Sequence, residues 1–243
     1  MVRKVDYDER RKEILRKTIE YYLETAQPVS SEALLDRFKM DFSSATIRNT
    51  FQDLEDKGYL SHTHTSSGRI PTNLGYRFYI DDIMHKMELS FEEKNTLERF
   101  FDSYLEMGKD VFENASKIIS NFTHYVGIMN KEEQHGIYYC GWSYLFEQPE
   151  FRDIHIIQAI FRALEHDRLL ELMNRKMDNS TKVLIGDECG CPEMNNCSLV
   201  IHECSSPRKK FGRLAVLGPK RMAYDRVMSM MDYLSELIIR EFE

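Results

Sequence analysis

The sequence predicts an α+β protein in which helices dominate the first half of the chain and strands the second. Three short amphipathic helices and a small hairpin are expected before residue 72, and a long apolar heptad pattern follows them. Five strand-like segments lie within the last 120 residues. The chain has 243 residues, of which 42% are hydrophobic, so it can bury a substantial core.

Composition narrows the possible environment and partners. The chain contains no apolar run of the roughly 18 to 20 residues needed to cross a bilayer, and its start lacks the apolar region of a signal peptide. The odd number of cysteines, five, argues against a disulfide framework. A cytoplasmic protein without a membrane partner is therefore expected. The net charge is −7, yet residues 1–77 hold 13 basic and 12 acidic side chains, so any polyanionic partner is expected there.

The first 88 residues are predicted to form a winged helix-turn-helix domain. Apolar residues repeat at helical spacing over residues 7–25, and Pro28 ends that helix. Ser30 and Ser31 begin a short second helix, while Ser43 caps a third that ends at Gly58. The segments YLSHTH and RI, joined by the turn TSSG, then form the wing hairpin. A further helix is expected over residues 72–87.

The third helix carries the side chains expected to read DNA. Ile47, Phe51 and Leu54 fall on one stripe, which leaves the opposite face polar. Arg, Asn and Gln on such a face can make paired hydrogen bonds to base edges, although any small helical domain has a polar face. The predicted DNA contacts are Ser44, Ala45, Thr46, Arg48, Asn49 and Gln52 on the helix and His64, Thr65, Ser66, Ser67 and Arg69 on the wing.

Residues 89–122 are predicted to be a helical connector with a dimer interface. Their apolar residues repeat at 4-3-4-3 spacing through nearly four heptads, and such a stripe needs a partner. A helix packed on its own domain is the alternative, and two shorter helices meeting at Gly108 would also fit the pattern. The residues assigned to the dimer interface are Leu97, Phe101, Tyr104, Val111, Ile118 and Phe122.

Residues 123–243 are predicted to form a second domain of mixed helices and strands. Helices are expected at about 153–175 and 224–240. The segment SSPRKK is expected to be the loop of a hairpin between the last two strands. Strands are predicted at 125–129, 136–141, 182–186, 197–204 and 212–218.

Two collinear stretches of the chain carry long, continuous sequence motifs. The N-terminal stretch contains PVSSEALLDRF, SSATIRNTFQDLEDKGYL and HTSSGRIPTNLGYRFYID. The second stretch contains YLFEQPEF, IGDE, CSLVIHE and LGPKRMAYDRVMSMMDYLSEL. These two stretches resemble the family of the heat-inducible transcription repressor HrcA, and the resemblance covers well over half of the chain.

This resemblance implies a regulatory function. It implies a winged helix that binds an inverted-repeat operator in double-stranded DNA as a homodimer and represses chaperone genes. It also implies a GAF-like effector domain, an inserted dimerisation domain, and activity maintained by the chaperonin GroEL. The present chain is shorter: YVGIMN reaches GIYYCGWSYLFEQPEF after only KEEQH, so most of the inserted domain is expected to be missing and the GAF-like domain to be reduced.

A zinc- or thiol-responsive sensor on the same DNA-binding platform is the main alternative. Cys189, Cys191, Cys197 and Cys204 could supply four thiolates, but six residues separate the last two, where metal-binding pairs normally have two to four. A strand over 197–204 would also point its two cysteines to opposite faces. The chain has no nucleophile elbow, zincin helix or phosphate-binding glycine loop. No catalytic residue, metal ligand or cofactor is therefore predicted.

Overall fold

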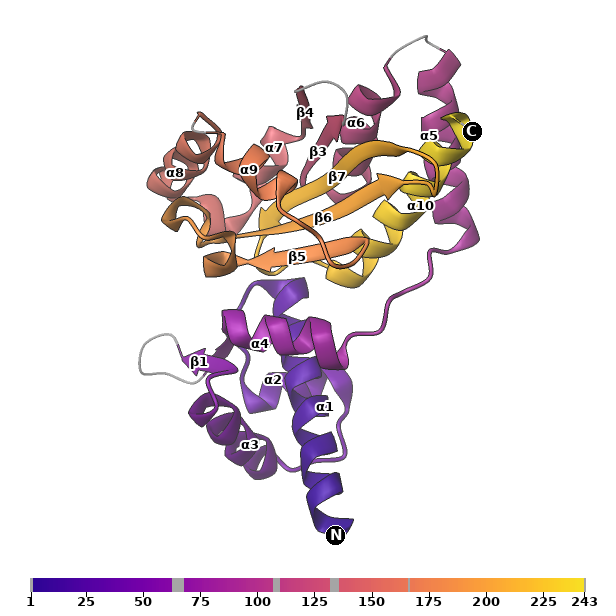
Figure 1. Ribbon diagram of the computed structural model, residues 1–243. Helices are drawn as coiled ribbons and strands as arrows, with labels where there is room; N and C mark the ends of the chain where they lie inside the picture. The colour runs from indigo at the N-terminus through magenta and orange to yellow at the C-terminus, as the bar shows by residue number, and fades with distance from the viewer. Residues whose placement is uncertain (1, 63–67, 107–109, 132–135, 166, 243) are drawn as a thin grey trace. The chain divides into compact units, whose positions relative to one another are not determined.

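The computed structural model describes residues 2–62, 68–106, 110–131, 136–165 and 167–242, with side chains from residue 8 onward. The chain forms two compact units, Met1–His85 and Lys86–Glu243 (Figure 1). Among the described residues, no helix combines the length and apolar character needed to cross a membrane.

The first unit is a helical domain with a two-stranded antiparallel hairpin, as expected for a winged helix-turn-helix. The hydroxyls of Ser30 and Ser43 accept hydrogen bonds from the first-turn amides of Ala33 and Thr46, both at 3.1 Å, which confirms both predicted caps. Its elements are α1 (Val2–Thr25), α2 (Ser31–Phe38), α3 (Ser44–Asp56), β1 (Leu60–His62), β2 (Arg69–Pro71), α4 (Asn73–Phe78) and a π-helical turn (Tyr79–Ile83).

The last helix of this unit is shorter than predicted. The sequence pattern favoured a helix over residues 72–87, but the helical backbone ends at Ile83 and Met84 is extended. Met87 and Leu89 extend the apolar pattern beyond Ile83, but both lie in a segment that is not helical.

The second unit is a five-stranded antiparallel sheet covered by helices on both faces. The strand order is β4-β3-β7-β6-β5, and all five predicted strands are present. Its helices are α5 (Phe91–Glu106), α6 (Val111–Thr123), α7 (Trp142–Glu147), α8 (Ile154–Glu165), α9 (Arg168–Asn174) and α10 (Tyr224–Phe242). Its strands are β3 (Val126–Lys131), β4 (Ile137–Cys140), β5 (Thr181–Ile185), β6 (Cys197–Ser205) and β7 (Lys210–Pro219), and short 3-10 turns occupy Pro149–Phe151, Gly186–Cys189 and Pro192–Met194.

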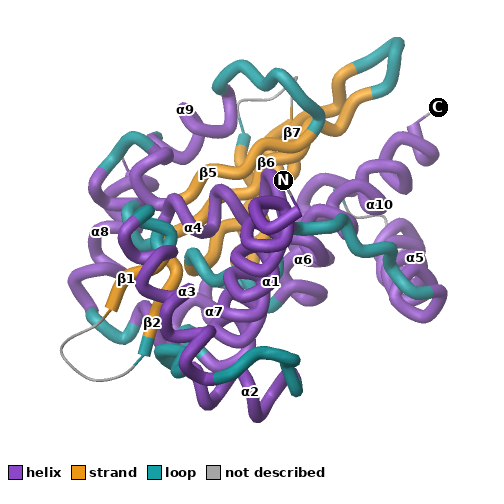
Figure 2. Tube along the Cα trace, turned by 90° about the horizontal axis from the view of Figure 1, so that it is seen from below, coloured by secondary structure: helices purple, strands orange, loops and turns teal. Residues whose placement is uncertain are grey.

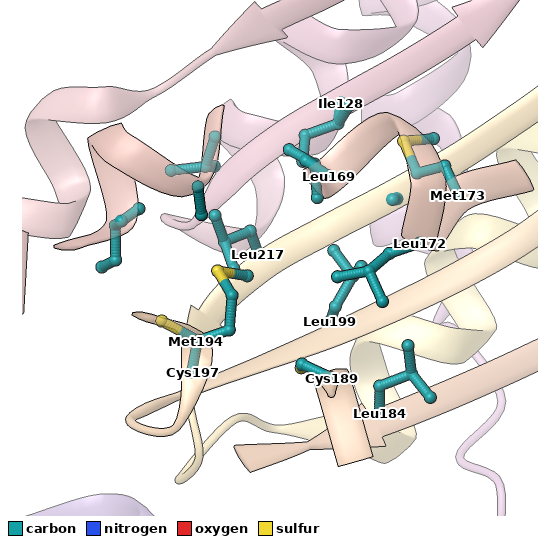
Figure 3. Packing of buried hydrophobic residues seen from close by; sticks show 14 of the residues in the cluster. Ile128, Leu169, Leu172, Met173, Leu184, Cys189, Met194, Cys197, Leu199 and Leu217 are labelled. Carbon is teal, nitrogen blue, oxygen red and sulfur yellow. The ribbon is translucent and has the colours of Figure 1, made fainter. Parts of the chain in front are cut away.

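Alternate residues of β6 face the two helical layers. Cys197 and Leu199 join a cluster with α8 and α9 (Figure 3), whereas the Ser198 hydroxyl lies 2.7 Å from the Tyr224 hydroxyl of α10. Cys204 points to the α10 side and donates to the Ser235 carbonyl at 3.9 Å. The predicted placement of the two strand cysteines on opposite faces is confirmed, and burial of both faces explains the almost uninterrupted apolar sequence of β6.

Two predicted helices are each divided in two. The helix expected over 153–175 is interrupted at Asp167, which has a left-handed backbone with φ of +56°. The heptad stripe occupies α5 and α6, as in the alternative with two shorter helices. The Asp110 carboxylate accepts from the amide of Phe112 at 2.8 Å and so caps a new helix. Gly108 lies outside the described residues.

A buried histidine on β6 lies in surroundings that disfavour its protonation. The Nδ1 atom of His202 lies 2.9 Å from the Thr181 hydroxyl and 3.1 Å from the Asp232 carboxylate, which also contacts the Lys86 ammonium. Burial, together with the charge of Lys86, lowers the pKa of His202 to about 4, although Glu203 acts in the opposite direction. The unfolded chain therefore takes up a proton near pH 6.5, and the folded chain only near pH 4.

We expect acidification between these two pKa values to destabilise the protein through His202. Its contribution is fully present above about pH 6.5 and falls by up to about 3 kcal/mol as the pH approaches 4. Urea unfolding of the wild type and of His202→Gln across this range should show a difference in unfolding free energy that changes with pH. Parallel curves for the two proteins would contradict the assignment.

Candidate nucleic-acid interface

The helix α3 has one buried face and one solvent-exposed face, as its spacing predicts. Ile47, Phe51 and Leu54 are 0%, 4% and 2% exposed and anchor the helix in the core of the first unit. Its C-terminus is fixed by Gly58, whose amide donates to the Glu55 carbonyl at 2.8 Å and whose φ is +77°. The orientation of α3 is therefore set by the core and by both ends of the helix.

The predicted base-reading side chains share the exposed face of α3. Ala45, Arg48, Asn49 and Gln52 are all exposed, at positions that recur on one side of a helix. Ser44 and Thr46 are half-buried at its first turn. No hydrogen bond within the described part of the chain involves the Asn49 amide, whereas Gln52 Nε2 donates to the Asp56 carboxylate at 2.9 Å.

A carboxylate from the preceding helix organises the start of this face. Glu32 on α2 accepts from the Ser44 hydroxyl at 3.0 Å and lies 3.5 Å from Arg48 Nη2. Arg48 Nη2 also donates to the Ser44 hydroxyl at 2.8 Å. A backbone hydrogen bond to Glu32, followed by those from Ser44 and Ser31, lowers the pKa of Glu32, so it is ionised at neutral pH. The sequence pattern gave no reason to connect Glu32 with the third helix.

The wing is described only at its base. The strands β1 and β2 lie beside α3 (Figure 2), and their register pairs His62 with Arg69. The predicted contacts His64, Thr65, Ser66 and Ser67 lie outside the described residues. Arg69 is half-buried, and its Nε atom lies 3.0 Å from the carboxylate of Glu55 on α3. Only spatial proximity reveals this ion pair, because the two residues lie in different elements.

The predicted dimer stripe is largely internal. Leu97, Phe101 and Ile118 are 0%, 4% and 1% exposed, covered by the second unit itself. Their assignment to a dimer interface is therefore wrong, because a side chain already buried within its own chain has no surface to offer a partner. The other three residues, Tyr104, Val111 and Phe122, are half-buried.

The cysteines are suited to packing rather than to sensing. All five are free thiols. Burial raises the pKa of Cys189 to about 12 and that of Cys204 to about 11, and it also raises the pKa of Cys197 and Cys191. A thiol with a raised pKa holds little of the reactive thiolate at neutral pH. Within the described ranges, no group of three or more histidine, cysteine or acidic side chains could hold a metal ion.

Comparison with known proteins shows that the chain is similar to heat-inducible transcription repressors. The family model of the HrcA protein C-terminal domain matches residues 128–228, which lie in the second unit. A heat-inducible transcription repressor HrcA from Carboxydothermus hydrogenoformans is 24% identical over 330 residues and covers 95% of this chain and 97% of its own. The corresponding repressor from Geobacter sulfurreducens is 26% identical over 341 residues, covering 98% and 99%.

The same comparison confirms that this chain is short. The first alignment spans 330 residues against the 243 of this chain, so at least 87 positions have no counterpart here. Only five residues join the end of β3 at Lys131 to the start of β4 at Ile137, the place where the inserted domain was expected to be missing.

A solved structure shares the fold. The crystal structure of a hypothetical protein matches with a TM-score of 0.75 and covers 93% of this chain and 96% of its own, at 19% sequence identity. The match covers residues of both units.

Proposed function

We propose that this chain, which is similar to the heat-inducible transcription repressors HrcA, is a repressor of heat-shock genes that binds an inverted-repeat operator in double-stranded DNA as a homodimer. As part of this proposal, we assign the chain as a cytoplasmic repressor without catalytic activity. The observation that carries the proposal is the exposed polar face of α3, which is held by a buried apolar stripe on its other side.

The side chains on this face suit the major groove. An asparagine or glutamine amide can pair with both the N6 and the N7 of adenine, and an arginine guanidinium with the O6 and N7 of guanine. We assign base contacts to Arg48, Asn49 and Gln52, with Ser44, Ala45 and Thr46 at the first turn next to the DNA backbone. Amides at a helix N-terminus favour such a phosphate contact.

The wing would supply the second contact with DNA. Arg69 is the assigned cation, and His64, Thr65, Ser66 and Ser67 are the assigned polar contacts nearby. Phosphate contacts of this kind position a protein without selecting its sequence. Two copies of the chain are needed because the two halves of an inverted repeat are related by a twofold axis.

Control by the chaperonin GroEL is the regulatory part of the proposal. It follows from the family, and the second unit would be the element that responds. The thiol-sensing alternative is weaker because burial raises the pKa of Cys189 and Cys204. The zinc-binding alternative is weaker because no group of three or more histidine, cysteine or acidic side chains in the described ranges could hold a metal ion.

The test is retardation of DNA from the chain's own chaperone promoter region, with and without GroEL. Specific retardation that GroEL strengthens would support the whole proposal. Retardation that GroEL leaves unchanged would contradict only the proposed control by the chaperonin. If the chain bound the promoter DNA no more tightly than random DNA, the proposed binding to an operator would be overturned. Loss of binding after mild oxidation, or zinc retained through dialysis, would favour the alternative.

A further inference from the structure

One carboxylate on the recognition helix holds both strands of the wing. Glu55 lies in the last turn of α3, and its side chain is 16% exposed. Its carboxylate is 3.0 Å from Arg69 Nε on β2 and also contacts Nδ1 of His62 on β1. His62 and Arg69 are direct cross-strand partners, so Glu55 contacts the hairpin at the pair nearest its tip among the residues that the structure describes.

The backbone at this position is fixed from the other side. The amide and carbonyl of Arg69 exchange hydrogen bonds of 2.9 Å with Val29, which lies just before α2. The neighbouring Gly68 approaches Pro28 so closely that an added Cβ would lie 2.4 Å from the Cβ of the proline. The backbone of Arg69 is thus held against this segment. The ion pair with Glu55 then sets the direction of the Arg69 side chain.

The charge of Glu55 is unfavourable for the function proposed above. A carboxylate near the DNA-binding face repels the phosphate backbone, so electrostatics alone predict that removing it strengthens binding. A negative charge at this place is useful only if it orders groups that bind DNA. Arg69 has further guanidinium N–H groups, and a guanidinium anchored by one carboxylate presents the others in a fixed direction.

We propose that Glu55 is a positioning residue that orients Arg69 and the base of the wing relative to α3. Both DNA-binding elements can then contact one duplex at the same time. This inference rests on the proposed function, because it concerns how the same surface meets DNA. It assigns to Glu55 no contact with DNA of its own.

A single substitution tests the inference, because the inference and simple charge repulsion predict opposite changes in operator affinity. Glu55→Gln removes the charge with little change in shape, and we expect it to weaken operator binding about tenfold and to reduce the salt slope by about one unit. Arg69→Ala should have a similar effect. The control is Asp41→Asn, which removes an exposed carboxylate just before α3 and should leave binding unchanged or slightly tighter.

The double variant of Glu55→Gln and Arg69→Ala shows whether Glu55 acts through Arg69 or independently of it. In the Arg69→Ala background, Glu55→Gln should cause no further loss, and the remaining repulsion predicts equal or tighter binding. Glu55→Ala should behave as Glu55→Gln does, with the fold of each variant checked by thermal unfolding.

The outcomes distinguish this inference from the function on which it rests. Binding by Glu55→Gln that equals or exceeds that of the wild type would overturn the positioning role alone, as would losses that add in the double variant. A folded wild-type chain that binds no operator would overturn both.

Discussion

Replacing Phe101 by aspartate is expected to unfold the second unit. Phe101 is 4% exposed on α5, a helix tied to α10 by an ion pair of 3.1 Å between Glu93 and Arg226. Truncating a buried phenylalanine costs about 3 to 5 kcal/mol, and a buried unpaired charge adds to that cost. The total is comparable with the whole stability of a domain, about 5 to 15 kcal/mol.

The neighbouring residue provides a matched control for this prediction. Phe100 is 43% exposed on the same helix, so Phe100→Asp should cost less than about 1 kcal/mol. Thermal unfolding followed by circular dichroism compares the two variants directly. If Phe101→Asp remained as stable as the wild type and only separated a dimer on sedimentation, the stripe would be an interface after all, contrary to its burial.

The second large effect is expected at the base-reading face. Asn49→Ala should weaken binding to the operator by roughly 1 to 3 kcal/mol and change binding to random DNA much less. Gln52→Ala should act in the same way but more weakly, because the amide of Gln52 gives up a hydrogen bond to Asp56 before it can bind a base.

Salt-matched titrations with operator and random duplexes measure this selectivity. Gln158→Ala is the control, since Gln158 is an exposed helical glutamine in the other unit and its loss should change neither affinity. Equal losses on both duplexes would assign Asn49 to the DNA backbone instead of a base.

Local features of the sequence were sufficient to predict most elements. The caps at Ser30 and Ser43, the stop at Gly58 and the stripe of Ile47, Phe51 and Leu54 were all predicted, and the structure contains them. Caps, turns and periodic burial depend on residues within about one or two turns of each other, so the sequence alone determines them. The exposed face of α3 follows from the same local rule.

Contacts between distant residues were decided only by the tertiary structure. Periodicity showed that residues 97–122 have an apolar face, but the face pattern is the same whether a second molecule or the chain's own α10 covers it. The ion pair of Glu55 with Arg69 depends on how the hairpin folds back onto α3, and the burial of His202 depends on α10 reaching β6. Sequence spacing therefore determined which residues share a face of this protein, and long-range packing determined what each face meets.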